Sequence, residues 1–301
     1  MNGKKIYSKL RDEYIGKFFA IFCGLIIVVL TVTIITFLTY KGISTFTNHD
    51  FPLVKYLTST LWRPDRDIQN GGPEFGILIF ILGSTFVSLL AVAISAPIGV
   101  ALAIFMNYIS PKLGTKIMQP AMELFVGIPS VVYGFVGIVI LVPFIKKCFG
   151  GLGFSLLAGI IVLSIMILPT IASISSDAVK TIPKDYLEAS YGLGATRWQT
   201  IIKVIIPAAK NGIFTGIVLG LARAFGEALA VQMVIGNAIN LPSTLLNPTS
   251  TITSILAMDM ANTTTGSSWN NALWSMALFL LIISFIFILI IKFIEKRGEN
   301  R

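Results

Sequence analysis

One pair of charged residues stands inside a long apolar stretch of the chain. Arg223 and Glu227 lie in the run GIFTGIVLGLARAFGEALAVQMVIG. A charged side chain at the centre of a membrane helix costs about 2.5–3.5 kcal/mol on insertion scales, so such residues usually face a protein interior or an aqueous path. A guanidinium group is planar, permanently charged and geometrically matched to phosphate-like oxyanions. The pair therefore predicts a path for an anion, although two charges four residues apart on a helix could also simply neutralise each other.

Gly216, Gly220 and Gly226 lie inside the same run. Small residues let helices in a membrane approach closely, so these positions allow either tight packing or room for a solute. An arginine held by a nearby glutamate would attract an anion without trapping it. These residue types favour an anionic substrate and do not distinguish phosphate from sulfate.

Residues 185–207 form a second candidate site, a polar and basic segment between two apolar runs. Leu187 and Tyr191 are four apart and share one helix face. Gly192 and Gly194 then break that helix, because glycine is a poor helix former and a good turn former. The threonine two residues after Gly194 can cap a second helix. Two short helices with an apolar edge, joined by a bend, suit the groove of a partner protein.

The composition indicates a membrane protein. Of 301 residues 55% are hydrophobic and 12% are charged, whereas soluble domains carry about 25% charged residues. Cys23 lies inside the first apolar run and Cys148 near the end of the third, at different depths, which argues against a disulfide or metal site. His49 is the only histidine. The chain has no phosphate-binding glycine loop ending in Gly-Lys-Ser/Thr, so we expect no ATP hydrolysis and no cofactor on this chain.

Six apolar runs are long enough to span a bilayer, which takes about 20 residues as a helix. The first is too long for the apolar part of a secretory signal and is expected to be retained. The sequence therefore predicts an all-α membrane protein with six transmembrane helices. The expected spans are residues 18–40, 76–108, 117–145, 153–176, 208–235 and 269–294.

The connecting segments divide the chain. We expect residues 1–75 to hold a cytoplasmic segment, the first span and an extracytoplasmic loop, and residues 76–294 to form a five-helix core with a cytoplasmic loop at 177–207. Residues 295–301 are a cytoplasmic tail. Gly127-Ile128-Pro129-Ser130 predicts an irregular turn inside the third span, which lipid tolerates only under cover of protein or water. The Thr/Ser/Asn-rich segment before the last span is expected outside, with residues 249–253 open to solvent.

The charge distribution gives an orientation. Six spans place both termini on one side, and sixteen of the 23 lysines and arginines fall on that side, against six on the other. Basic residues concentrate in cytoplasmic loops. Both termini and the segment 185–207 are therefore expected in the cytoplasm, and the net charge of +9 needs no nucleic-acid partner to explain it.

The segment 185–207 resembles the signature loop of permease subunits of bacterial ABC importers. That signature is Glu-Ala-Ala, three residues, Gly, nine residues and Ile-x-Leu-Pro, and here its spacing is intact. The matching residues are Glu188-Ala189-Ser190, Gly194, Val204 and Ile206-Pro207, with serine, valine and isoleucine as mild departures. The resemblance implies a coupling helix that docks on an ATPase subunit. The residues it assigns to docking are Leu187, Glu188, Ala189, Ser190, Tyr191 and Gly194.

Residues 223–228, 231–237 and 127–134 are similar to the PstC-type permeases of phosphate importers. This resemblance implies a type I importer (MetI-like) fold. It also implies a PstA-type second permease, a PstB-type ATPase pair that binds ATP and Mg, a PstS-type binding protein, and inorganic phosphate as substrate. In that family the matching arginine and glutamate, here Arg223 and Glu227, are implicated in phosphate passage. Ser130 and Tyr133 are further candidates, because polar groups beside a broken helix could line the path, but core packing accounts for them equally.

The sequence thus predicts a permease subunit in a bacterial cytoplasmic membrane that catalyses no bond chemistry itself. Alternatives are a permease for sulfate, molybdate or another solute, and the PstA-type partner. The Arg223 region and residues 127–134, which match the phosphate family, separate phosphate from the other solutes. A solitary secondary transporter or channel would have no use for an ATPase-docking loop. An intramembrane enzyme would need a histidine cluster, a Ser-Lys dyad or paired carboxylates, which the spans do not offer.

Overall fold

The computed structural model describes residues 3–48, 51–67, 69 and 71–299, so His49 lies outside the described residues. Within them the regular elements are all helices apart from one hairpin of two two-residue strands, and irregular segments connect them. The first half contains α1 (Gly3–Asn48), α2 (Leu53–Thr58), β1 (Trp62–Arg63), β2 (Glu74–Phe75), α3 (Leu78–Ile104), α4 (Pro111–Leu113), α5 (Gln119–Gly127), α6 (Ser130–Val136) and α7 (Val142–Phe149). The second half contains α8 (Leu156–Lys180), α9 (Lys184–Gly192), α10 (Arg197–Thr200), α11 (Ile206–Ala208), α12 (Lys210–Gly226), α13 (Leu229–Ile235), α14 (Ile252–Asp259) and α15 (Ser268–Glu299).

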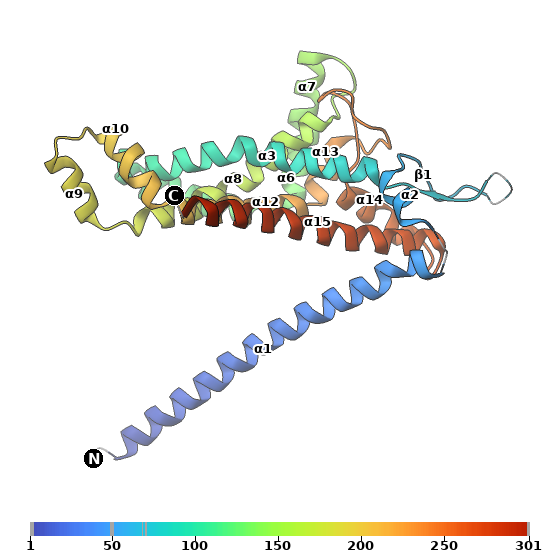
Figure 1. The fold of residues 1–301 in the computed structure, drawn as a ribbon. Helices are drawn as coiled ribbons and strands as arrows, with labels where there is room; N and C mark the ends of the chain where they lie inside the picture. Colours follow the sequence, from blue (N-terminus) through green and yellow to red (C-terminus); the bar gives the residue numbers. More distant parts are fainter. Residues whose placement is uncertain (1–2, 49–50, 68, 70, 300–301) are drawn as a thin grey trace.

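The long helices α3, α8, α12 and α15 run side by side and form the body of the molecule (Figure 1). The α9–α10 hairpin, residues 184–200, projects at one end of the molecule, the end toward which the last turns of α15 run. The short helices α2 and α14 and the β1–β2 hairpin gather at the opposite end. Helix α1 meets α15 near this second end and then diverges from the bundle. The first turns of α1 therefore lie toward the same end of the molecule as the α9–α10 hairpin.

Five described helices are long and apolar enough to span a membrane, and one bent pair could form a sixth. Four of the expected spans appear as single elements: α1, α3 with its final π turn, α8 and α15. The third and fifth expected spans are each broken. The bent pair consists of Arg197–Ala208 and Lys210–Gly226, which meet at 68°. The last part of the α9–α10 hairpin thus continues through a bend into α12.

The third expected span is interrupted where the sequence predicts it. Helix α5 ends at Gly127, Ile128 and Pro129 are extended, and α6 starts at Ser130. Pro129 has no N–H to bond to the Phe125 carbonyl, and a proline disfavours helical geometry at the residue before it, here Ile128, which is extended. The spanning part of this run is therefore the helix at residues 130–149.

The fifth expected span, 208–235, is also not continuous, which corrects the sequence prediction. Helix α12 ends at Gly226, Glu227 has an extended backbone with φ −74° and ψ 126°, and α13 starts at Leu229. Arg223 therefore lies in the last turn of a helix and not in the middle of one. Gly226 is exposed and its added Cβ would meet nothing within 4 Å.

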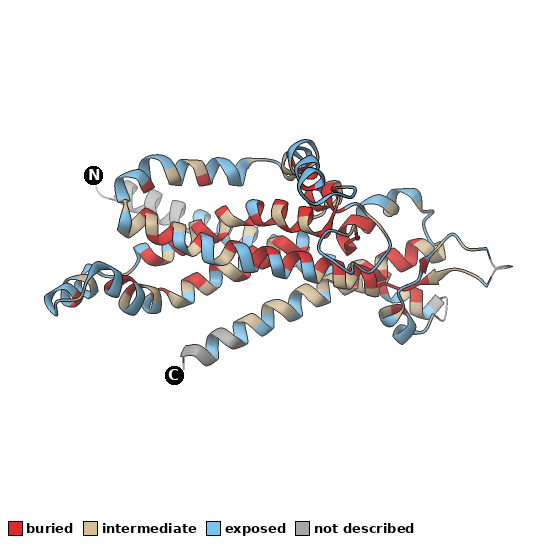
Figure 2. Cartoon of the chain, turned by 90° about the horizontal axis from the view of Figure 1, so that it is seen from above, coloured by how far each residue is buried: buried red, intermediate tan, exposed pale blue. Residues whose placement is uncertain are grey.

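Close packing holds α12 and α3 against α8. A Cβ on Gly220 would come within 2.6 Å of Ile171 in α8, and a Cβ on Gly99 within 3.0 Å of the same side chain. Interhelical hydrogen bonds add to this contact, since Ser95 donates to the Ser164 carbonyl at 2.8 Å. Small residues at an interface between membrane helices let the two backbones approach closely. Figure 2 shows the buried residues concentrated in the centre of the bundle and the exposed ones on the α9–α10 hairpin.

Residues 249–253 are buried, contrary to the expectation that they would be open to solvent. Thr249, Ser250 and Ile252 have no exposed surface at all. Here the chain dips back between α3 and α13: Ile252 N–H donates to Ser84 Oγ at 2.9 Å, and a Cβ on Gly83 would collide with the Ser250 carbonyl. The hydroxyl-rich composition serves this re-entrant stretch, because its backbone groups need partners inside the bundle.

Candidate functional site

Arg223 is positioned by α12 at the point where that helix meets α8. Its Nη1 donates a hydrogen bond of 2.8 Å to Thr170 Oγ1. The residue is half-buried. Guanidinium offers five N–H donors, and the structure records one of them in use. The remaining donors and the permanent charge are available for a ligand.

Glu227 does not neutralise Arg223, because the helix ends between them. The structure records no ion pair joining these two described residues. The Glu227 carboxylate instead accepts a hydrogen bond from Ala230 N–H at 3.0 Å, at the start of α13. A negative charge at a helix N-terminus is stabilised by the unpaired N–H groups there. The alternative in which the pair is a simple i,i+4 salt bridge is therefore wrong in this structure.

Glu227 also borders a small polar crevice between α3, α12, α13 and α14. The Glu227 carbonyl accepts from Thr253 Oγ1 at 2.7 Å, which fixes the extended backbone at the helix break. Four hydroxyl groups and one carboxylate thus face one crevice, next to the end of the helix that carries Arg223. Its lining residues are Ser84, Val87, Ser88, Ala224, Phe225, Glu227, Val231, Thr251 and Thr253.

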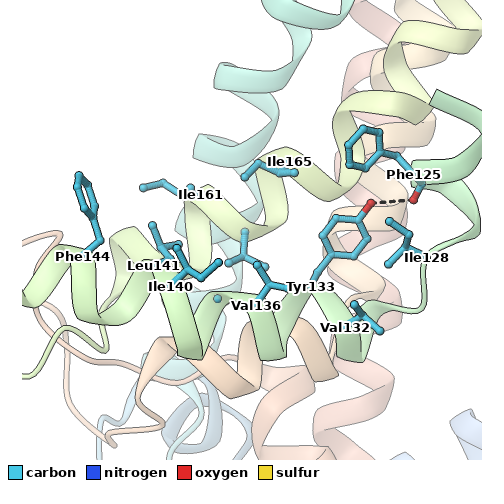
Figure 3. Close-up of a pocket in the computed structure, with 12 residues that line it drawn as sticks. Phe125, Ile128, Val132, Tyr133, Val136, Ile140, Leu141, Phe144, Ile161 and Ile165 are labelled. Atoms are coloured by element: carbon cyan, nitrogen blue, oxygen red, sulfur yellow. Dashed lines mark hydrogen bonds between the residues drawn. The ribbon is translucent and has the colours of Figure 1, made fainter. Parts of the chain in front are cut away.

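Tyr133 has a local structural task. Its hydroxyl donates to the Phe125 carbonyl at 2.7 Å, across the break between α5 and α6 (Figure 3). In a continuous helix that carbonyl would accept from residue 129, but Pro129 has no N–H to give. The bond therefore satisfies an orphan backbone group. Ser130 is half-buried at the first turn of α6, and the structure records no hydrogen bond of its side chain in the described part of the chain.

An open groove of about 400 Å³ runs beside Tyr133, lined by α6, α7 and α8. Apart from the tyrosine hydroxyl, which is already hydrogen-bonded, its lining is apolar, as Figure 3 shows. Neither Arg223 nor Glu227 borders it. The groove suits hydrocarbon or another apolar surface and is no site for an anion.

The second candidate site, the α9–α10 hairpin, has the bend that its sequence predicts. Helix α9 runs through Gly192, and the turn falls at Gly194, whose φ is +80°. Thr196 caps α10 in a reciprocal capping box with Gln199. The sequence prediction placed the break at both glycines, but Gly192 is the last residue of the helix and only Gly194 needs the left-handed conformation that favours glycine.

The structure separates the six predicted docking residues into two groups. Leu187 packs inward against a cluster that includes Ile201, and Ser190 is buried with its Oγ 2.9 Å from Thr200 Oγ1. These two residues hold the hairpin together. Glu188, Ala189, Tyr191 and Gly194 are exposed.

Two large apolar side chains on this hairpin were not among the sequence candidates. Leu193 is 90% exposed and Trp198 is 62% exposed. Tyr186 and Tyr191 of the same hairpin are also exposed. The signal available in the sequence was a pair of bulky apolar residues in an otherwise polar loop. Clusters of exposed apolar residues rimmed by polar ones mark interaction sites.

The hairpin is also tied to the end of the second span. Arg197 Nη2 donates to the Ile109 carbonyl at 3.1 Å. A force on the hairpin would therefore reach α3 as well as α12. In the described residues, no three His, Cys, Asp or Glu side chains come together as a metal site would require.

Comparison with known proteins identifies the family to which this chain is similar. Residues 95–299 match the family described as binding-protein-dependent transport system inner membrane component. The chain is 51% identical over 289 residues to the probable ABC transporter permease protein YqgH of Bacillus subtilis, covering 96% of this chain and 92% of that protein. It is 33% identical to the phosphate transport system permease protein PstC of Mesorhizobium japonicum, covering 82% and 79%. The probable PstC of Methanocaldococcus jannaschii is 30% identical, covering 100% and 98%.

Solved structures show the same fold at lower identity. A chain of the bacterial alginate ABC transporter aligns with a TM-score of 0.62 and 16% identity, covering 95% of this chain and 97% of that one. A chain of the MetNI methionine ABC transporter aligns with a TM-score of 0.51 and 22% identity, covering 74% and 92%. The predicted all-α membrane fold of the type I importer permeases is confirmed by these likenesses.

Proposed function

This chain belongs to the family of binding-protein-dependent transport system inner membrane components, and from that premise we propose that it is the PstC-type permease of an ATP-driven phosphate importer. It is a multi-pass membrane protein and a transport subunit rather than an enzyme. ATP hydrolysis belongs to a separate ATPase chain, and an extracytoplasmic binding protein delivers the substrate. We assign to this importer a PstA-type second permease, a PstB-type ATPase pair and a PstS-type binding protein.

The observation that carries the substrate class is the state of Arg223. It is a permanent cation in a membrane-embedded bundle, and its recorded partner is the neutral hydroxyl of Thr170. A cation without a paired carboxylate in such a place favours an anion as the transported species. The names of two relatives, a phosphate and a probable phosphate transport system permease protein, support phosphate as the oxyanion. The Glu227 carboxylate, which is stabilised at the start of α13, lines the crevice beside Arg223. Its negative charge repels an anion and so limits how tightly the anion binds there.

Coupling is assigned to the exposed apolar surface of the α9–α10 hairpin. Tyr191, Leu193 and Trp198 project from it, while Leu187 and Ser190 fix its shape. Closure of the ATPase pair would push on this hairpin. Because the hairpin continues through a 68° bend into α12, the movement reaches the helix that carries Arg223.

The substrate assignment is tested by purifying the complex with its native partners and reconstituting it in liposomes. We expect uptake of radiolabelled phosphate that requires ATP and the binding protein and that excess sulfate does not inhibit. Uptake specific for sulfate would contradict phosphate as the substrate but would agree with an oxyanion as the substrate class. Uptake without ATP would favour a solitary carrier.

From the positive-inside count we assign both termini and the α9–α10 hairpin to the cytoplasm. Single cysteines can test this orientation in a Cys23→Ser, Cys148→Ser background, which is needed because Cys148 is itself exposed. Thr264 and Thr181 are both exposed and lie on opposite sides of the expected membrane. Thr264→Cys should react with an impermeant thiol reagent added to intact cells, and Thr181→Cys should react only after the membrane is opened. The reverse pattern would invert the topology. Positions 249–253 are unsuitable for this purpose, since they are buried.

A further inference from the structure

A row of polar side chains descends α8 from the Arg223 contact toward the cytoplasmic end. The row consists of Thr170, Ser173, Asp177 and Lys180. Positions three and four apart lie on one face of a helix. None of the four is buried, whereas the residues between them at 171, 172, 175, 176 and 179 are buried. The row is thus the open face of a helix whose other side is packed in the bundle.

The row is connected at both ends. At the upper end Thr170 Oγ1 accepts from Arg223 at 2.8 Å. At the lower end Lys180 Nζ lies 3.7 Å from Asp177 Oδ1 and donates to Gln119 Oε1 at 3.4 Å. Gln119 in turn donates to Glu123 Oε1 at 3.3 Å. Ten residues of helix between Thr170 and Lys180 span about 15 Å.

Among the described residues, Ser173 lacks the backbone hydrogen bond that several other hydroxyl residues in the membrane helices make. Ser164, Thr215 and Ser284 each donate to the carbonyl four residues earlier, as serine and threonine commonly do inside helices. For the half-buried Ser173 the described part of the structure records no hydrogen bond. Its donor is therefore available to water or to a passing ligand.

We infer that this α8 row, residues 170, 173, 177 and 180, lines the cytoplasmic half of the oxyanion's path. Polar and charged side chains are costly against lipid, so one full face of them indicates water or protein opposite. The inference rests on the proposed function, because the anion is what Arg223 attracts. Below Arg223 the hydroxyl groups of Thr170 and Ser173 offer donors without charge.

The lower end of the row is suited to release. Lys180 would attract an anion, but Asp177 beside it compensates that charge, and Glu123 adds a further carboxylate nearby. An anion therefore meets no net positive site at the exit. Passage requires binding strong enough for entry into the path and weak enough for departure. Arg223 provides the binding needed for entry, and the neutralised pair of Asp177 and Lys180 at the cytoplasmic end allows release.

Cysteine accessibility tests whether the row faces water in the assembled complex. In the Cys23→Ser, Cys148→Ser background, Ser173→Cys should react with a negatively charged methanethiosulfonate applied to inside-out vesicles. The matched control is Ile165→Cys, on the same helix in the apolar groove. Reaction at 173 should be at least about tenfold faster, because the reacting thiolate forms only where water reaches it. Equal, slow reaction at both positions would mean that the second permease or lipid covers the row, and would overturn the inference.

A transport measurement tests the role of the hydroxyl. Ser173→Val should lower ATP-driven phosphate uptake about three- to tenfold, the effect of one neutral hydrogen bond, while Ser173→Thr retains it. Ser284→Val makes the same chemical change on α15, away from the row, and should leave uptake unchanged. Equal uptake by the valine and threonine variants would contradict the assignment.

The labelling result does not depend on which oxyanion is carried. If the complex imports sulfate and position 173 still reacts, the phosphate proposal is contradicted, but the inferred path along α8 is not. A complex that imports phosphate but resists labelling at 173 would reject the path alone.

Discussion

Replacing Arg223 with glutamine should reduce phosphate uptake by the assembled complex about 10- to 100-fold, the loss expected when a hydrogen bond to a charged group disappears. Glutamine keeps much of the length and can still donate to Thr170 Oγ1, the partner that Arg223 has at 2.8 Å. The contact between α12 and α8 should therefore persist while the charge is lost. Membrane abundance and copurification of the partner subunits report on folding. Initial uptake rates of radiolabelled phosphate report on function.

Arg223→Lys is the matched control for charge. Lysine keeps the positive charge but loses the planar fork that matches an oxyanion, so we expect uptake between those of the wild type and Arg223→Gln. The Glu227 carboxylate accepts a hydrogen bond from Ala230 N–H and forms no recorded ion pair with Arg223. Loss of the arginine therefore does not leave this carboxylate without a partner. Adding Glu227→Gln should therefore not restore uptake. Restoration by the double change, or near-normal uptake by Arg223→Gln, would remove Arg223 from the path.

Replacing Gly194 with valine should uncouple ATP hydrolysis from transport. Gly194 has φ +80°, a conformation that costs an ordinary L-residue about 1–2 kcal/mol and a β-branched residue more. The bend between α9 and α10 would open or shift, and the exposed surface of Leu193 and Trp198 would be displaced. We expect phosphate transported per ATP hydrolysed to fall at least about fivefold, in line with that free energy. The subunit should still insert into the membrane.

Gly192 provides a matched control two residues away. A Cβ added at either glycine would meet no atom within 4 Å, but only Gly194 has a positive φ. Gly192→Ala should therefore be close to neutral and Gly194→Ala impaired, with the difference caused by backbone conformation alone. Asparagine tolerates the left-handed region, so Gly194→Asn should recover part of the coupling. Full transport coupling in Gly194→Val would count against the hairpin as the docking element.

The sequence by itself determined the features that depend on local signals. Apolar runs longer than a bilayer is thick identify spanning segments whatever their neighbours are. Thr196 and Gln199 cap a helix within one turn, and Pro129 removes a hydrogen bond between residues four apart. Both signals are local, so the sequence alone predicts the hairpin and the break before Ser130. The signature spacing around Glu188 and Gly194 is equally local.

Only the tertiary structure decided what the central charges do. The spacing of Arg223 and Glu227 implies contact if the helix continues, but Thr253, 26 residues away in sequence, holds the Glu227 carbonyl, and the helix ends. Arg223 finds Thr170, 53 residues away. Residues 249–253 look like a polar loop in sequence but are buried, and the hydroxyls of Thr249, Thr251 and Thr253 find partners inside the bundle. Spacing along the chain predicts contacts within a helix, whereas these bonds join segments that only the packing of several helices brings together.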